Sequence, residues 1–382
     1  MLLPLCWGLA CGGGSRGENE TMVATAGQAS SDDGVSTGPS SSGSMPPDDT
    51  TGGIKLDVAF ETENMAGDPD DMSGCDKVDF LFIIDNSGSM GDEQGNLVSS
   101  FPGFIDTIQS TLDEAQDYHI MVLDVDAYIY EQCQQACENA PPECIVDGIC
   151  SIMAGPACAF PCLLGSVCGI GGGYQCGVTQ PEECEDVLGA GVTHPRGEGS
   201  SNEDCMFSTG ARYMDSNQPD LSGTFECAAQ VGVSSYAGTE RPMEAMVQAV
   251  SGSTEAAACN EGFLRDDAIL VVTFITDEDD AFGDSAGTPA GWKQALISAK
   301  NGDENAIVVL GLFGDNDQPG AICQPLVDAD GAEPSPRLRE FVDSFGDKGF
   351  FGSVCAPSYD EFFQQAVGLI DVTCEEFIPP QG

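Results

Sequence analysis

Apolar residues follow two different patterns from residue 78 onward. Short runs of consecutive apolar side chains, such as residues 268–275, are typical of strands that are buried on both faces of a sheet. Longer segments between these runs carry the periodicity of helices. The pattern predicts strands at 78–84, 119–125, 268–275, 306–313 and 349–354. It predicts helices at 94–112, 241–250, 289–300, 336–345 and 359–372.

This alternation of strands and helices predicts an α/β fold of the doubly wound, Rossmann-like kind, in which helices cover both faces of a mostly parallel sheet. We expect the domain to cover residues 77–374 and to be followed by a short tail at 375–382. An acidic lead-in precedes the domain at residues 54–76, with one edge strand at 54–60.

The first 53 residues have a different composition from the rest. Residues 12–53 are rich in Gly, Ser, Thr and Pro, which bury too little surface to offset the entropy of ordering, so we expect a flexible tether. Residues 1–11 begin with an apolar run that ends in small residues before Cys11. This segment resembles a bacterial lipoprotein signal peptide. The resemblance implies that Cys11 carries a lipid and anchors the chain to the cell envelope, at the outer membrane or cell surface.

Eighteen cysteines are too many for a reduced cytosolic chain without a metal framework, so they predict an oxidising compartment. Many of them lie among Gly and Pro at about residues 131–205, which predicts a disulfide-stapled insertion in the domain. Zinc is the weaker alternative, because His119 and His194 form no short Cys/His pairs. We expect Cys75 and Cys374 to pair, because both ends of such a sheet can lie close together. The disulfide candidates are Cys75, Cys133, Cys137, Cys144, Cys150, Cys158, Cys162, Cys168, Cys176, Cys184, Cys205, Cys227, Cys259, Cys323, Cys355 and Cys374.

The charge of the chain limits its partners. Twelve Lys and Arg face 63 Asp and Glu, which leaves a net charge of −51 that repels nucleic acid and anionic membrane surfaces. A solvating acidic surface explains this charge better than an array of calcium sites. No segment after the N-terminus has the roughly 20 continuous apolar residues of a spanning helix, so we expect membrane contact only through the lipid.

Oxygen-bearing side chains stand at the ends of two predicted strands and at the start of a predicted helix. Asp85, Ser87 and Ser89 follow the first strand, Thr239 precedes the helix at 241–250, and Asp277 follows the strand at 268–275. We expect all of them at one rim of the sheet. Two carboxylates and three hydroxyls suit a hard divalent cation and leave coordination positions open.

The order of these residues resembles the von Willebrand factor type A domain and its metal-ion-dependent adhesion site. The resemblance runs from about residue 78 to residue 372 and is interrupted by the cysteine-rich insertion. It implies that Ser87, Ser89 and Thr239 bind Mg²⁺ or Mn²⁺ directly, and that Asp85 and Asp277 act directly or through water. It also implies that a carboxylate of a partner protein completes the coordination shell.

Two parts of this site stay open at the level of sequence. Ser234 or Ser235 could replace Thr239 as the ligand of the second loop, and Thr239 could instead cap the following helix. The family usually has Gly after the last aspartate, whereas this chain has an acidic run that could be a solvated loop, a rim of the site, or a second cation site that recruits Ca²⁺. This run is Glu278, Asp279 and Asp280.

Enzymatic functions fit the sequence less well. Phosphate-transferring folds with a strand-end aspartate need a second aspartate two residues on, where this chain has Ser87. His119 is expected to be a packed strand residue, His194 lies in the insertion, and no Gly-x-Ser-x-Gly motif is present. We therefore expect a surface-tethered adhesion or protein-binding module rather than an enzyme. A scaffold protein that is merely stabilised by its metal is the alternative, and a metal-dependent hydrolase is a distant third.

Overall fold

The computed structural model describes residues 76–111, 117–126, 137–146, 148–159, 162, 173–176, 183–197, 199–233, 240–281, 283–327 and 331–380. The predicted signal segment, the tether and nearly all of the acidic lead-in lie outside these residues, as do Cys11 and Cys75. Within the described part of the chain, no helix is both long enough and apolar enough to cross a lipid bilayer.

A six-stranded sheet forms the centre of the domain, in the order β6-β2-β1-β7-β8-β9. All neighbouring strands run parallel except β6, which pairs with β2 in the antiparallel direction. The strands are β1 Lys77–Ile84, β2 Asp117–Leu123, β6 Met214–Asp215, β7 Ile269–Ile275, β8 Ile307–Phe313 and β9 Gly349–Ser353. In the centre of the sheet, Phe82 of β1 stands between Val122 of β2 and Thr273 of β7. The predicted α/β fold with a mostly parallel sheet is confirmed.

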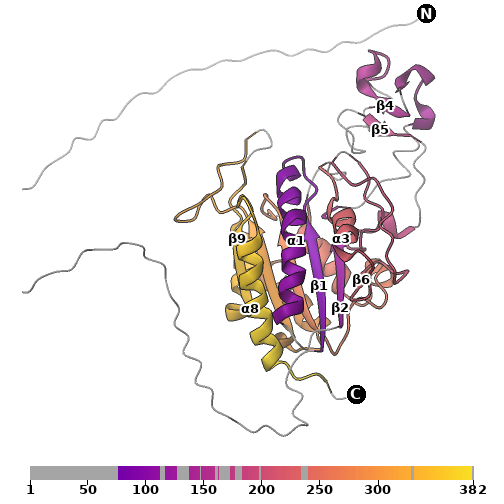
Figure 1. Ribbon diagram of the computed structural model, residues 1–382. Helices are drawn as coiled ribbons and strands as arrows, with labels where there is room; N and C mark the ends of the chain where they lie inside the picture. The colour runs from indigo at the N-terminus through magenta and orange to yellow at the C-terminus, as the bar shows by residue number, and fades with distance from the viewer. Residues whose placement is uncertain are drawn as a thin grey trace, which may run out of the picture. The chain divides into compact units, whose positions relative to one another are not determined.

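Helices cover both faces of this sheet. On the face toward the viewer in Figure 1 lie α1 Gly91–Thr111, α3 Leu221–Ala229 and α8 Asp360–Glu376. The opposite face packs against α4 Pro242–Val250, α6 Pro289–Ala299 and α7 Pro336–Asp343. The short helix α5 Glu255–Cys259 follows α4. Short 3-10 helices are η1 Pro142–Cys144, η2 Ile152–Ala154, η4 Glu183–Asp186, η5 Glu304–Ala306 and η6 Gly346–Lys348.

The two helical layers explain why the strands are continuously apolar. Successive side chains of a strand point to opposite faces, so Phe80 and Phe82 enter the core under α1, α3 and α8. Leu81 and Ile83 enter the second core under α4, α6 and α7. Because both faces are covered, no strand position in this part of β1 is left for a polar residue.

The five strands and five helices predicted from residue 78 onward are all present, with boundaries shifted by a few residues. The edge strand predicted at 54–60 lies outside the described residues. The sequence missed β6, which has only two residues, and it missed α3 and α5. It also missed a small antiparallel sheet of β3 Ile145–Val146, β4 Ile149–Ser151 and β5 Gly173–Gln175 inside the cysteine-rich segment. These strands are too short to leave a periodic signal.

The described cysteines form disulfides, as predicted. The pairs are Cys137–Cys176, Cys144–Cys158, Cys150–Cys162, Cys184–Cys259, Cys205–Cys227 and Cys323–Cys355. Cys374 is disulfide-bonded as well, but Cys75 lies outside the described residues, so their pairing stays a prediction. Cys133 and Cys168 also lie outside. This density of disulfides indicates an oxidising, extracytoplasmic location.

The cysteine-rich segment divides into two differently anchored parts. Cysteines between residues 137 and 176 pair with one another and form a small core of their own. Residues 183–205 are instead fastened to the α/β domain, because Cys184 reaches α5 and Cys205 reaches α3. The backbone N–H of Val192 also donates a 2.8 Å hydrogen bond to the carbonyl oxygen of Val122 in β2.

Candidate functional site

The candidate cation site lies where β1 and β7 end, next to each other at the carboxyl edge of the sheet. The chain leaves β1 through α1 toward β2 on one side, and β7 lies on the other side of β1. Open α/β sheets bind ligands at such a reversal of strand order. The structure brings Asp85, Ser87, Ser89 and Asp277 together here. Thr239, like the alternatives Ser234 and Ser235, lies outside the described residues.

Asp85 is held rigidly and is fully buried. Its Oδ2 accepts a 2.6 Å hydrogen bond from the hydroxyl of Thr276, and its Oδ1 accepts a 2.7 Å bond from the backbone N–H of Ser87. The side-chain amide of Gln94 donates to the carbonyl oxygens of Asp85 at 2.9 Å and Gly232 at 2.7 Å. These bonds fix the loop after β1 against the first turns of α1.

Asp277 and the two serines form the other half of the site. The hydroxyl of Ser87 lies 3.2 Å from that of Ser89 and 3.4 Å from Oδ1 of Asp277. The backbone N–H of Glu333 donates to the carbonyl oxygen of Asp277 at 2.7 Å. Oδ2 of Asp277 is fully buried and has no hydrogen-bond partner among the described residues. A buried carboxylate oxygen without a partner is costly, so a ligand or cation would be favoured next to it.

The raised pKa values of Asp85 and Asp277 also favour a cation between them. Burial, followed by the charges of Asp277 and Glu240, raises the pKa of Asp85 to about 8. Burial also raises the pKa of Asp277, although hydrogen bonds from Ser89 and Ser87 oppose it. Because these carboxylates repel each other, a divalent cation between them would favour their charged forms.

The acidic run after Asp277 contains side chains with different roles. Asp279 accepts hydrogen bonds from the backbone N–H groups of Arg337 at 3.3 Å and Leu338 at 3.2 Å, so it caps α7. Asp280 accepts a 3.1 Å bond from the backbone N–H of Met243 and therefore caps α4. These two carboxylates are used to start helices, which the sequence did not reveal.

Glu278 differs from its two neighbours because other carboxylates act on its pKa. Burial and then the charge of Glu240, a residue that the sequence did not single out, raise the pKa of Glu278 to about 9. The charges of Asp85 and Asp277 act in the same direction.

The donor set suits a hard cation. Asp85, Asp277, Ser87 and Ser89 offer only oxygen atoms, which Mg²⁺, Mn²⁺ and Ca²⁺ accept and which softer metals bind less well. Among the residues that the structure describes, no three His, Cys, Asp or Glu side chains are arranged as a ready metal-binding group. A cation here would thus depend on two aspartates supplemented by hydroxyls, and the unpartnered oxygen of Asp277 fits that requirement.

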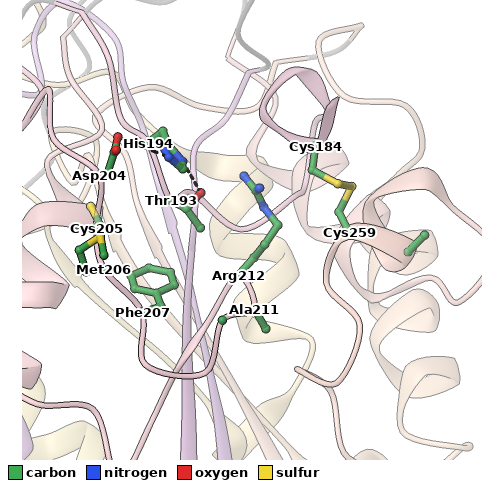
Figure 2. Close-up of a pocket in the computed structure, with 12 residues that line it drawn as sticks. Cys184, Thr193, His194, Asp204, Cys205, Met206, Phe207, Ala211, Arg212 and Cys259 are labelled. Atoms are coloured by element: carbon green, nitrogen blue, oxygen red, sulfur yellow. Dashed lines mark hydrogen bonds and ion pairs between the residues drawn. A yellow bond between two sulfur atoms is a disulfide. The ribbon is translucent and has the colours of Figure 1, made fainter. Parts of the chain in front are cut away.

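A second feature is a cavity of about 540 Å³ beside the segment 193–194. Figure 2 shows the Cys184–Cys259 disulfide on one side of it and Asp204 with Cys205 on the other. His194 lines the cavity, although the sequence gave this histidine no partner. No sequence signal could have found the cavity, because its walls come from separate segments around residues 184–194, 204–212 and 258–259.

The polar groups of this cavity satisfy one another. Nδ1 of His194 lies 2.7 Å from the hydroxyl of Thr193 and 3.2 Å from Oε1 of Glu185, and its Nε2 lies 3.3 Å from Asp204. Arg212 forms a buried ion pair with Glu185. Burial would raise the pKa of Glu185, but the hydrogen bond from His194 and the guanidinium of Arg212 outweigh it and lower the pKa. The network therefore holds together segments that are distant in sequence.

The chain's other histidine is packed, as expected. His119 lies in β2, where its Nδ1 is 2.8 Å from the carbonyl oxygen of Phe263. Its ring lies against Tyr213, with ring centroids 4.4 Å apart.

No protein-family model and no curated protein matches this chain. The fold class by itself is shared by proteins of many functions. What this chain does must therefore be inferred from the geometry and charge of its candidate cation site.

Proposed function

We propose that this chain is an extracytoplasmic, metal-dependent protein-binding module of the von Willebrand factor A type. Its bound divalent cation would capture an acidic group of a partner protein. The observation that carries the proposal is the meeting of Asp85, Ser87 and Asp277 at adjacent strand ends, with the buried Oδ2 of Asp277 left without a partner among the described residues.

Each side chain has a definite part in this function. Asp85 and Asp277 supply negative charge, and the hydroxyls of Ser87 and Ser89 supply neutral oxygen donors. Thr239 is the predicted donor from the second loop. When bound, Mg²⁺, Mn²⁺ or Ca²⁺ supplies a positive charge with an open position that a carboxylate can occupy. Thr276 and Gln94 keep Asp85 oriented, so little ordering is needed on binding.

The proposed cellular setting is the bacterial cell envelope. The disulfides indicate an oxidising compartment, and the resemblance of residues 1–11 to a lipoprotein signal supports a lipid on Cys11. The composition of residues 12–53 supports a tether between that lipid and the domain. We expect the Cys11→Ser variant to leave the membrane fraction and to lack the mass of the lipid. Wild-type chain that carries no lipid would contradict the anchor.

Calorimetric titration with Mg²⁺, Mn²⁺ and Ca²⁺ tests the cation site. The wild-type chain should bind at least one of these ions, and Asp277→Ala should abolish binding while the far-UV circular dichroism spectrum is retained. Absence of binding in the wild-type chain would overturn the proposal.

Partner binding separates this function from a scaffold role. Immobilised wild-type chain should retain envelope proteins in the presence of the cation and release them in EDTA, and cross-linking should locate the contact at the loop after β1. Asp85→Ala should lose this retention without losing thermal stability in EDTA. If Asp85→Ala lowered stability but kept its partners, the metal would serve the fold alone.

A further inference from the structure

A turn of the cysteine-rich segment, formed by residues 197 and 199–202, is closed by its own side chains. We call it the Gly199 turn. Oδ1 of Asn202 accepts a 3.1 Å hydrogen bond from the backbone N–H of Gly197, and Nδ2 of Asn202 donates at 2.9 Å to the carbonyl oxygen of Gly197. The Cys205–Cys227 disulfide then ties the following residues to α3. The turn is therefore stiff and fastened to the α/β domain.

The Gly199 turn packs against residues 230–233, which follow α3. The backbone N–H of Ser201 donates to the carbonyl oxygen of Gln230 at 3.1 Å. Gly199 has a φ of +74°, and a Cβ at this position would lie 2.8 Å from Cγ2 of Val233, closer than real side chains come. Glycine is thus needed both for the backbone conformation and for the close approach to Val233.

Val233 also lies against the loop that follows β1. A Cβ on Gly88 would lie 3.9 Å from the carbonyl oxygen of Val233, and one on Gly91 would lie 3.7 Å from its Cγ1. Gly88 stands between Ser87 and Ser89 in the sequence. Val233 therefore contacts both the Gly199 turn and the backbone that carries the two hydroxyls of the candidate cation site.

Gln94 joins the same two segments by hydrogen bonds. Its Nε2 donates to the carbonyl oxygens of Asp85 at 2.9 Å and Gly232 at 2.7 Å, and its Oε1 accepts from the backbone N–H of Gly232 at 3.4 Å. The side chain is buried, so water competes little for these bonds. Because one amide group binds both carbonyl oxygens, a displacement of Gly232 is passed to the backbone of Asp85.

We propose that the Gly199 turn positions the candidate cation site through Val233 and Gln94, and that Gln94 is a positioning residue of that site. This inference rests on the proposed cation site. It gives residues 183–205 a function: two disulfides hold this segment on the domain, and its turn keeps the loop after β1 in the geometry that binds the cation. Mg²⁺ demands a near-ideal octahedron and Ca²⁺ accepts flexible geometry, so a displaced loop weakens Mg²⁺ binding more.

The first test compares Gly199→Ala with Gly210→Ala in calorimetric titrations with Mg²⁺ and Ca²⁺. Gly210 is the matched control, because its φ is +67° but a Cβ there would meet no heavy atom within 4 Å among the described residues. Gly199→Ala should lose about threefold or more in Mg²⁺ affinity and less in Ca²⁺ affinity. Gly210→Ala should change both affinities by less than about twofold.

The second test compares Gln94→Met with Gln218→Met in the same titrations. Gln218 is also a buried glutamine that binds main chain, since its Nε2 donates to the carbonyl oxygens of Met206 at 3.2 Å and Pro219 at 3.1 Å. Both variants should lose stability in EDTA, because each leaves carbonyl oxygens without a donor. Only Gln94→Met should lose Mg²⁺ affinity, by about tenfold or more, and shift the Mg²⁺/Ca²⁺ ratio toward Ca²⁺.

The outcomes separate this inference from the cation site itself. If wild type bound neither ion, or if Asp277→Ala left binding intact, the cation site and the inference would both fail. If wild type bound a cation but Gly199→Ala matched Gly210→Ala in both affinities, the inference alone would fail, whatever Gln94→Met did. Should Gly199→Ala not fold, Val233→Ala takes its place and should lose Mg²⁺ affinity in the same way, because it removes the contact between the turn and the loop.

Discussion

Two of the places where the chain buries carboxylates compensate their charge in opposite ways. Beside the cavity, Glu185 is paired with Arg212, His194 and Thr193, and its pKa is lowered. At the candidate cation site, Asp85 has only hydroxyl and amide donors, and its pKa is raised to about 8. Burial is similar at both places, so the difference comes from the available positive charge.

This contrast teaches how to recognise a ligand site in a strongly acidic protein. With 12 Lys and Arg for 63 Asp and Glu, most carboxylates must remain in water. A buried carboxylate that the chain supplies with an arginine is part of the fold. One that is buried without any cation requires a proton or an external ion, and the site around Asp277 combines this with an unpartnered oxygen and adjacent hydroxyls.

Removing the arginine of the buried Arg212–Glu185 ion pair should have the largest effect on stability. Arg212→Ala leaves the buried carboxylate of Glu185 without its ion pair, which should lower the free energy of unfolding by about 3–5 kcal/mol. Chemical denaturation in EDTA measures this loss. Arg196→Ala is the control, since its partner Asp204 is mostly exposed and such pairs contribute about 1 kcal/mol or less. Equal losses in both variants would remove the distinction between the two regions.

Binding of a divalent cation at the candidate site should have the next largest effect on stability. Cation at a hundred times its dissociation constant should raise the free energy of unfolding of the wild-type chain by about 2.7 kcal/mol, because only the folded state has the site. Asp277→Asn should abolish this gain, and in EDTA it should be at least as stable as wild type because a buried charge is removed. Denaturation curves with and without cation measure both. A gain that persisted in Asp277→Asn would place the cation elsewhere.

A smaller effect is expected in the acidic run of Glu278, Asp279 and Asp280, where stability and cation affinity should respond differently. Asp279→Ala should lower the free energy of unfolding by about 1 kcal/mol, because α7 loses the acceptor for its first N–H groups. Its cation affinity should stay close to that of wild type. If this variant instead weakened cation binding as strongly as Asp277→Ala, Asp279 would belong to the site.

The last comparison concerns how stability depends on pH through the buried Glu93. Burial, followed by a hydrogen bond with Asp92, raises the pKa of the buried Glu93 to about 8. A carboxyl whose folded pKa is raised contributes stability that is complete below its unfolded value and is lost as the pH rises through about 8. In EDTA, the stability of Glu93→Gln should therefore fall less than that of wild type between pH 5 and pH 8. Parallel pH profiles would show that Glu93 titrates normally.

Much of the sheet could be predicted from sequence, because a strand covered on both faces is apolar at nearly every position. Strands β1, β7 and β8 are mostly apolar, with Asp79 in β1 and Thr273 in β7 as buried exceptions, and all three strands were found. β6 was missed because a two-residue edge strand is defined by its partner β2 rather than by its own residues. The same reason applies to the short strands of the cysteine-rich segment, which disulfides and not periodicity hold in place.

The candidate site could be predicted only in part. Asp85, Ser87, Ser89 and Asp277 stood out because each follows a buried strand, and the structure brings them together. The influence of Glu240 on the pKa of Glu278 could not be predicted, because the two residues are distant in sequence. The helix-capping roles of Asp279 and Asp280 depend on where α7 and α4 begin in space.

The sequence by itself determined the α/β class, the oxidising compartment and the residue types available for a hard cation, since these depend on composition and on local pattern. Tertiary structure decided the rest. It placed β7 next to β1, so that Asp277 lies beside Asp85. It also directed Arg212 to Glu185, and it left Oδ2 of Asp277 without a hydrogen-bond partner among the described residues. Charge compensation is a property of distances between segments far apart in the chain, and only folding sets those distances.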